Sequence, residues 1–224
     1  MLYNVVVNDW GETTYVPTIL GKVLLVVVIL ALLAVAVFCT KKASENKKKL
    51  TVKQLVFCAM AMALGTVLSN IKLFHFPTGG SITLLSMLVI CLPGYWFGLG
   101  AGLITGVAYG FLQLLIDPYV LYPMQLVVDY ILAFGALGLS GLFANKKYGL
   151  LKGYGAGVIG RYVFAVISGW ILFGEYAWDG WSALPYSLVY NAIYIFAEAA
   201  ITVIIIAIPA VRKAMESVKK LATE

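Results

Sequence analysis

The 224-residue sequence is 62% hydrophobic and only 12% charged, and its mean hydropathy is +0.95. A soluble domain carries about 25% charged residues, so this composition excludes an ordinary soluble protein and indicates an integral membrane protein. The net charge of +6 accompanies no nucleic-acid-binding motif. The basic residues instead cluster between apolar segments, which makes them a signal of membrane topology.

Apolar segments of near-membrane length predict helices over 17–39, 53–71, 83–98, 99–116, 124–144, 153–173 and 184–209. At ~1.5 Å per residue, about 20 residues cross a ~30 Å hydrocarbon layer. The segments lack the strict alternation of barrel strands, so helices are expected. The predicted fold class is an all-α integral membrane protein, with a six-helix bundle preceded by one extra N-terminal transmembrane helix.

Most of the 16 Lys and Arg residues lie in 41–53, 146–152 and 212–220. If these regions are cytoplasmic, every predicted helix alternates correctly and the positive-inside rule is satisfied. The sequence therefore predicts a multi-pass protein of the cell membrane, with its N-terminus outside and its C-terminus in the cytoplasm.

The first predicted helix is an addition to a compact unit. A signal peptide carries basic residues before its apolar core, whereas here the lysines follow it. We expect residues 1–40 to comprise an extracellular N-terminus and the extra helix. Residues 41–50 would then be a basic cytoplasmic linker, and residues 51–224 a six-helix substrate-binding membrane domain.

The outward loops 75–83, 117–123 and 174–186 gather aromatic residues, and Asp129 lies just inside the outer end of a predicted helix. A carboxylate at such depth is costly unless something pairs with it, and no Lys or Arg lies nearby except close to the surface. Asp129 is therefore a candidate contact for a cationic ligand. Structural hydrogen bonding and proton coupling are the alternatives.

Tyr186, Tyr190 and Asn191 share one face of the last predicted helix. Such a face can stack on a heteroaromatic ring while its amide and hydroxyls hydrogen-bond the ring nitrogens, or it can be a packed polar helix interface. Trp178, in the loop "EYAWDGW", is either part of an interfacial aromatic belt or part of a lid.

Arg161 and Glu198 are predicted to lie at similar depths on consecutive antiparallel helices, so we expect them to form a structural ion pair. The sequence shows no catalytic nucleophile–base pair, no metal-ligand cluster and no cofactor motif, so an enzyme is not expected. Gly102 and Gly106 have the spacing that favours close helix packing. Ala59 and Ala63 form a small-residue stripe that serves packing either within the chain or against a partner.

The stretches "AMAMALG", "PTGGSITL", "DPYVLYPMQLVVDYILAFGALGLSGLF", "SGWILFGEYAWDGW" and "PYSLVYNA" together resemble the thiamine-specific S components of energy-coupling factor (ECF) vitamin transporters. The resemblance implies a substrate-capture subunit without its own ATPase. Such a subunit binds thiamine from outside beneath a lid formed by the loop between its first two helices. It docks on a membrane coupling subunit (EcfT) and two ATPase subunits.

The resemblance also implies roles for particular residues. Asp129 would face the thiazolium cation, and the other family contacts would fall on Tyr119, Tyr130, Phe173, Tyr186 and Asn191. Tyr190 and Trp178 join the predicted contacts from their places on the same helix face and in the aromatic loop. Pro77, Gly79 and Gly80 fall in the lid loop, and Ala59 and Ala63 on the partner-docking stripe.

Two positions depart from the family pattern. Ala165 stands where relatives often carry histidine, and Phe173 where one carries tryptophan. These departures leave open a thiamine precursor or another vitamin as the ligand. A standalone proton-coupled vitamin carrier is the other alternative. A phosphorylated form of thiamine is not expected, because no Arg or Lys cluster is predicted to face outward.

Overall fold

The computed structural model describes residues 3–7, 13–21, 23–24, 27, 50–76 and 79–224. Near the N-terminus, β1 (Tyr3–Val7) and β2 (Thr13–Pro17) pair antiparallel. Most of the predicted extra helix, the lysine linker and Pro77 lie outside the described residues, so the predictions for those segments and for the domain boundaries remain predictions.

The bundle begins with α2 (Val52–Asn70). Thr51 and Gln54 form a reciprocal capping box, in which the Thr51 hydroxyl accepts from the Gln54 amide at 3.2 Å and the Gln54 side chain accepts from the Thr51 amide at 2.9 Å. This exchange satisfies two amides that the first turn leaves unpaired. A hairpin of β3 (Lys72–His75) and β4 (Ser81–Thr83) then leads into the rest of the bundle.

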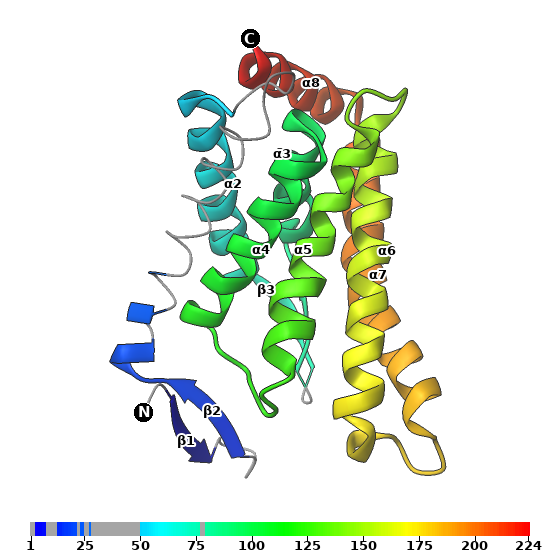
Figure 1. Ribbon diagram of the computed structural model, residues 1–224. Coiled ribbons are helices and arrows are strands. Elements are labelled where there is room, and N and C mark those ends of the chain that lie inside the picture. Colours follow the sequence, from blue (N-terminus) through cyan, green and yellow to red (C-terminus); the bar gives the residue numbers. More distant parts are fainter. Residues whose placement is uncertain (1–2, 8–12, 22, 25–26, 28–49, 77–78) are drawn as a thin grey trace.

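The remaining helices follow in chain order with short connections. They are α3 (Ser86–Phe97), α4 (Leu99–Ile116), the continuous segment formed by η1 (Leu126–Ala133), α5 (Phe134–Ala136) and η2 (Leu137–Phe143), then α6 (Gly149–Leu172), the short turn η3 (Gly174–Tyr176), α7 (Ala183–Ala207) and α8 (Pro209–Thr223). Figure 1 shows the long helices side by side, with the β3–β4 hairpin at one end and α8 lying across the other.

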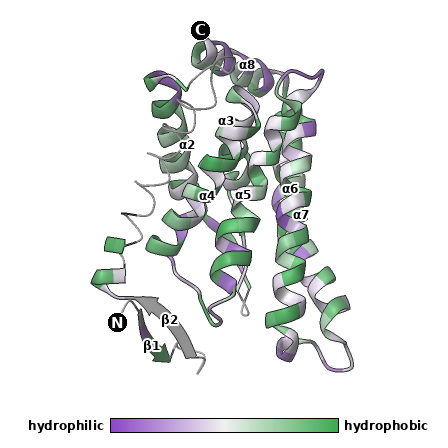
Figure 2. Ribbon diagram, viewed as in Figure 1, coloured by the Kyte–Doolittle hydropathy of each residue, from purple (hydrophilic) through white to green (hydrophobic). Residues whose placement is uncertain are grey.

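Five of these segments are long and apolar enough to cross a membrane: Val52–Asn70, Leu99–Ile116, Leu126–Phe143, Gly149–Leu172 and Ala183–Ala207. The twelve residues of α3 give a shorter apolar helix. Figure 2 shows hydrophobic residues along the lengths of the helices and hydrophilic residues concentrated on α8 and at the bundle ends. The predicted all-helical, multi-pass membrane architecture is confirmed.

Glycines let the central helices approach closely. A Cβ placed on Gly102 would lie 2.7 Å from the carbonyl oxygen of Gly138 and 2.7 Å from the Cα of Gly94. A Cβ on Gly106 would lie 3.1 Å from the Cα of Gly135. The close packing predicted from the spacing of Gly102 and Gly106 is therefore confirmed, and it joins α3, α4 and the η1–η2 segment into one core.

The sequence did not predict the amphipathic helix α8, since the last predicted segment ends at 209 and residues 212–220 indicated only a basic cytoplasmic region. Pro209 begins it, and α8 packs against α2 and α3 at the end of the bundle. The Lys219 ammonium lies 3.9 Å from the centre of the Tyr95 ring and donates to the Ala144 carbonyl. Burial against the bundle lowers the pKa of Lys219 from its ordinary value.

Candidate ligand-binding site

A cavity of about 100 Å³ lies between η1, α6, α7 and the β3–β4 hairpin. It joins a wider chamber of about 360 Å³ that extends toward α2 and α4. Aromatic rings dominate the smaller space, which is lined by Tyr119, Phe173, Tyr186, Tyr190 and Tyr194. Its polar lining comes from Asp129, Gln125, Ser168, Ser187 and Asn191.

Asp129 lies in the π-helical segment η1 and borders both chambers. Short π-helical segments are frequent at functional sites, because the wider turn redirects a side chain. The Ser168 hydroxyl of α6 donates to Asp129 Oδ2 at 2.9 Å. Within the described part of the chain, Asp129 forms no ion pair. Its carboxylate is therefore anchored from one side and available to a cation in the cavity.

The N-terminal part of α7 supplies the opposite wall. Asn191 is buried, and its amide donates to the Ser187 carbonyl at 2.9 Å. Its side-chain oxygen accepts from the Tyr194 hydroxyl at 2.6 Å. The rings of Tyr186 and Tyr190 lie 5.3 Å apart at 32°. This helix face thus combines fixed hydrogen-bonding groups with two adjacent tilted rings, a combination that suits a heteroaromatic ligand.

The β3–β4 hairpin covers the cavity. Gly79 and Gly80 adopt positive φ values of 84° and 79°. A Cβ on Gly79 would lie 2.9 Å from the Tyr119 ring, and the Gly79 carbonyl accepts from the Tyr190 hydroxyl. Both the backbone conformation and the close approach of the rings require glycine. The hairpin is thus fitted over the cavity by contacts with two of its wall residues.

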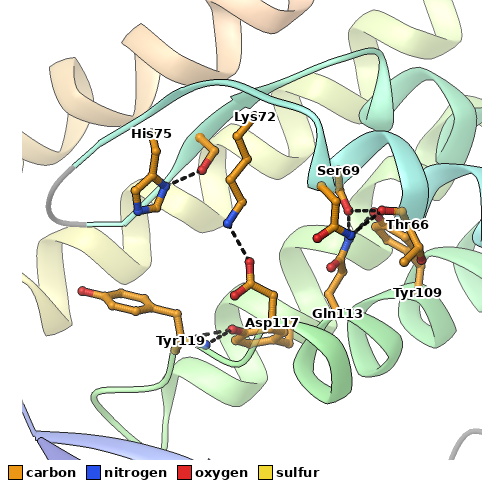
Figure 3. A network of polar contacts seen from close by, with 11 residues as sticks. Thr66, Ser69, Lys72, His75, Tyr109, Gln113, Asp117 and Tyr119 are labelled. Carbon is orange, nitrogen blue, oxygen red and sulfur yellow. Dashed lines mark hydrogen bonds and ion pairs between the residues drawn. The ribbon is translucent and has the colours of Figure 1, made fainter. Parts of the chain in front are cut away.

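The hairpin also meets the loop that follows α4. The Lys72 ammonium lies 2.8 Å from Asp117 Oδ2, and His75 Nδ1 lies 2.8 Å from the Ser81 hydroxyl (Figure 3). The Lys72–Asp117 pair is partly exposed, so its contribution to stability is at most about 1 kcal/mol. The pair joins the hairpin to the loop that follows α4.

Two predicted site residues lie one layer away from the smaller cavity. Tyr130 borders the wider chamber, and its hydroxyl accepts from the Tyr119 amide at 2.8 Å. Trp178 is 42% exposed and packs edge-on against Tyr186 at 5.2 Å. Tyr130 therefore positions the loop that carries Tyr119, and Trp178 supports the outer side of Tyr186.

Several residues that line the cavity were not predicted from the sequence: Gln125, Ser168, Gly169, Ser187 and Tyr194. Helical spacing could have identified some of them. Gln125 precedes Asp129 by four residues, and Ser187 precedes Asn191 by four, so each shares a face with a predicted residue. Ser168 could be found only by knowing that α6 lies beside η1.

The predicted ion pair between Arg161 and Glu198 is not formed. Glu198 is buried, and its carboxylate accepts from the Thr83 hydroxyl at 2.6 Å, the Ser86 hydroxyl at 3.2 Å and the Met87 amide at 3.0 Å. It therefore caps the N-terminus of α3, where a negative charge is favourable. The Arg161 guanidinium lies 4.6 Å from the centre of the Phe134 ring and borders the wider chamber.

Ala59 and Ala63 lie on the outward surface of α2, where both are exposed. Large apolar neighbours on the same helix are also exposed: Val56, Met60, Leu64 and Val67. The buried residues of α2 are Cys58, Ala61 and Gly65. The small-residue stripe therefore faces away from the bundle, so it does not serve packing within the described chain.

Comparison with known proteins identifies the family. The family model described as thiamine transporter protein (Thia_YuaJ) matches residues 55–217. The chain belongs to the thiamine transporter family. This family consists of transporters, which confirms the prediction that the chain is not an enzyme.

Individual relatives agree with this family membership. Thiamine transporter ThiT of Bacillus subtilis (strain 168) is 32% identical over an alignment of 177 residues, and the match covers 73% of this chain and 91% of the relative. A solved structure of ThiT from Listeria monocytogenes matches with a TM-score of 0.63 at 28% identity, and the match covers 75% of this chain and 96% of that one. The family and its fold thus extend over most of the bundle.

Proposed function

We propose that this protein is the substrate-binding S subunit of an ATP-driven ECF importer and that it captures thiamine from outside the cell. The observation that carries the proposal is Asp129, a carboxylate without an ion-pair partner in the described chain, at the wall of a cavity lined by tyrosines. Thiamine joins a permanently cationic thiazolium ring to an aminopyrimidine ring. A carboxylate combined with aromatic faces is complementary to both parts.

Each part of the ligand is assigned to a wall of the smaller cavity by its chemistry. The thiazolium would lie against Asp129, which Ser168 holds in place. The pyrimidine would stack against Tyr186 and Tyr190, with the Asn191 amide in reach of its ring nitrogens. The smaller space of about 100 Å³ is below the ~300 Å³ of typical ligand pockets, so the ligand must also use the neighbouring chamber or displace the hairpin.

The magnitudes require these contacts to act together. One cation–π contact contributes roughly 0.5–2 kcal/mol, whereas nanomolar binding needs about 12 kcal/mol. Exclusion of water strengthens every charge interaction in the site. The β3–β4 hairpin, held by Tyr190 and packed on Tyr119, is positioned to provide that exclusion and to act as the lid.

The orientation of the chain follows from the distribution of charge. The β3–β4 hairpin, the loop after α4 and the η3 region lie at one end of the bundle, while α8 lies at the other (Figure 1). Basic residues at the α8 end include Lys146, Lys147, Arg212 and Lys213. By the positive-inside rule, this distribution supports a cytoplasmic α8 end and a lid that faces outward.

The exposed stripe of α2 is the proposed docking surface for the coupling subunit. Small residues permit close helix approach in a membrane, and Ala59 and Ala63 face outward among exposed apolar side chains. Ala63→Leu should leave thiamine affinity unchanged but reduce co-purification with the coupling and ATPase subunits. Ala200→Leu, at an exposed alanine of α7, serves as the matched control. Equal co-purification of Ala63→Leu and the unsubstituted protein would contradict this docking surface.

The alternatives are separated by the ligand and by the energy source. Ala165 lines the cavity wall, where a histidine would add a hydrogen-bonding group, so a thiamine precursor or another vitamin remains the nearest alternative. A proton-coupled carrier would use Asp129, Arg161 and Glu198 as a relay. The multiple hydrogen bonds that hold Glu198 at the start of α3 favour a structural role for this residue instead.

The decisive experiment is a thiamine titration of the purified protein followed by tryptophan fluorescence. Trp178 packs against Tyr186 of the cavity wall, so ligand binding should change its emission. We expect saturable quenching at submicromolar thiamine and none with pyridoxine. Absence of a response to thiamine, together with a response to another cationic heteroaromatic compound, would replace the ligand but retain the site.

A further inference from the structure

The helix α8 takes no part in the ligand cavity, and its sides differ in character. It lies across the end of the bundle opposite the β3–β4 hairpin (Figure 1). Met215 and Ala222 pack on the main hydrophobic core, and Val211 on the same side is half-buried. These residues recur about once or twice in two turns, so they form one face of the helix. Packing against the bundle therefore accounts for that face alone.

An apolar strip beside the packed face remains uncovered. Ala214, Val218 and Leu221 are spaced by four and then three residues, so they lie along one side of α8. Val218 is 37% exposed and Leu221 is 62% exposed. A surface helix that met only the bundle and water would be polar outside its packed face. The strip therefore indicates a further apolar neighbour beside α8.

The remaining outward surface of α8 is basic. Between Pro209 and Thr223, Arg212 and three lysines stand against one acidic residue, Glu216. Arg212, Lys213 and Lys220 are exposed on sides of the helix that the strip does not occupy. An apolar strip beside an excess of positive charge is typical of helices that lie in the interface of an anionic membrane.

The loop between η2 and α6 extends this basic surface. Lys219 donates to the Ala144 carbonyl, which brings the loop beside α8. Lys146, Lys147 and Tyr148 follow in the loop and are exposed. The Lys147 ammonium lies 5.4 Å from the centre of the Tyr148 ring. An exposed tyrosine among lysines is typical of a membrane–water interface, so two segments distant in the sequence present interfacial residues at one end of the bundle.

The level of α8 along the bundle identifies what lies beside it. The membrane span Ala183–Ala207 is joined to α8 through Ile208, whose side chain is 48% exposed. The headgroup layer begins where the hydrocarbon layer ends, so α8 starts at that layer. Because α8 lies across the bundle (Figure 1), its sides stay near that level. Lipid is therefore the apolar neighbour of the strip, and headgroups surround the basic residues.

We propose that α8 and the 144–148 loop, together called the α8 surface, bind the headgroups of anionic phospholipids. Val218 and Leu221 enter the boundary between headgroups and acyl chains, while Arg212 and the exposed lysines contact lipid phosphates. A neutral bilayer would cover the strip but leave the positive charge without a partner, so charge complementarity selects the anionic headgroup. The α8 surface lies at the end of the bundle away from the cavity, so this proposal does not depend on which ligand the cavity binds.

The first test uses the purified full chain in an uncharged detergent, with phosphatidylglycerol or phosphatidylcholine of the same acyl chains added. Thermal unfolding measures the stabilisation that each lipid confers. We expect phosphatidylglycerol to raise the melting temperature by about 3 °C or more beyond phosphatidylcholine. This difference should shrink as the ionic strength rises, because salt screens exposed charges. Equal melting temperatures in the two lipids would overturn the proposal.

The second test assigns the difference between the lipids to α8. Lys213→Gln combined with Lys220→Gln removes two charges from the α8 surface. Lys53→Gln combined with Lys152→Gln is the matched control, since it removes two exposed lysines of α2 and α6. The advantage of phosphatidylglycerol should fall to about half or less in the first double variant and persist in the second. An equal fall in both would contradict the assignment to α8.

The third test addresses the apolar strip. Both lipids supply acyl chains, so Leu221→Gln should reduce the stabilisation by phosphatidylcholine as well as by phosphatidylglycerol. Ser217→Gln, at an exposed polar position of the same helix, is the control and should retain both. Full stabilisation of Leu221→Gln by both lipids would show that the strip does not enter the membrane interface.

A protein partner is the competing occupant of the α8 surface. If this surface docks the coupling subunit instead, the Lys213 and Lys220 double variant should keep the full advantage of phosphatidylglycerol and lose co-purification with that subunit. That pair of results would overturn the lipid proposal. Thiamine affinity should be the same in all of these variants, and a failure of the unsubstituted protein to bind thiamine would refute the proposed function while leaving the lipid measurements valid.

Discussion

Asp129 and Glu198 are two carboxylates within the same helix bundle, and their surroundings give them opposite roles. Glu198 accepts hydrogen bonds from Thr83, Ser86 and Met87 and caps a helix. Asp129 accepts from Ser168, also contacts the Gln125 side chain, and lines a cavity. A buried carboxylate whose acceptor positions are filled by the protein stabilises the fold, whereas one with unfilled positions is available to a ligand. If Asp129 binds the ligand and Glu198 stabilises the fold, substitutions at the two sites should change thiamine affinity to different degrees.

The largest effect on thiamine affinity is expected from Asp129→Asn. The substitution keeps the size of the side chain but removes the charge opposite the cation, at a cost of about 2–5 kcal/mol. Thiamine should bind about 30-fold more weakly or worse in a fluorescence or calorimetric titration. Asp179→Asn, in the exposed loop before α7, is the control and should bind normally. Unchanged affinity in Asp129→Asn would remove this residue from the site.

An intermediate effect is expected from Gly80→Ala in the lid. At a φ of 79° an alanine is strained, and its Cβ would lie 2.9 Å from the Tyr194 ring. Such strain costs about 1–3 kcal/mol, so thiamine should bind about 5- to 160-fold more weakly and dissociate faster.

Gly180→Ala is the matched control for the lid. Gly180 has the same φ of 79°, but a Cβ there would meet nothing within 4 Å. Its substitution should strain the loop without changing thiamine affinity. Stopped-flow dissociation of thiamine from both variants provides the measurement. Equal dissociation rates would show that the hairpin does not act as a lid.

The smallest effect on affinity is expected from Glu198→Gln, which should bind thiamine within about threefold of the unsubstituted protein. Its stability should fall, because hydrogen bonds to a charged group contribute about 1.5–3 kcal/mol. That loss corresponds to a fall in melting temperature of about 3–12 °C for a protein of this size. Thermal unfolding at one scan rate, with exposed Glu216→Gln as the control, measures it. A large loss of affinity without a loss of stability would move Glu198 into the binding site.

The sequence by itself determined the membrane class and the positions of the helices. Long apolar segments can avoid exposing backbone polar groups to lipid only as helices, so the predicted segments 53–71 and 184–209 correspond closely to Val52–Asn70 and Ala183–Ala207. The membrane class and the helix positions can be predicted from the composition and length of each apolar segment alone, without knowledge of its neighbours. The same holds for the glycines of the hairpin and for the unusual position of Asp129.

Only the tertiary structure decided which polar side chains meet. Depth along the membrane suggested that Arg161 would pair with Glu198, but the rotation of each helix about its axis directs Glu198 toward α3 and Arg161 toward the wider chamber. Ser168 reaches Asp129 because α6 packs beside η1. Hydrophobicity is nearly uniform around these helices, so the sequence carries little information about their rotation. Close packing between glycines and side chains fixes the rotation of each helix about its axis. That rotation in turn decides which groups surround Asp129, Arg161 and Glu198.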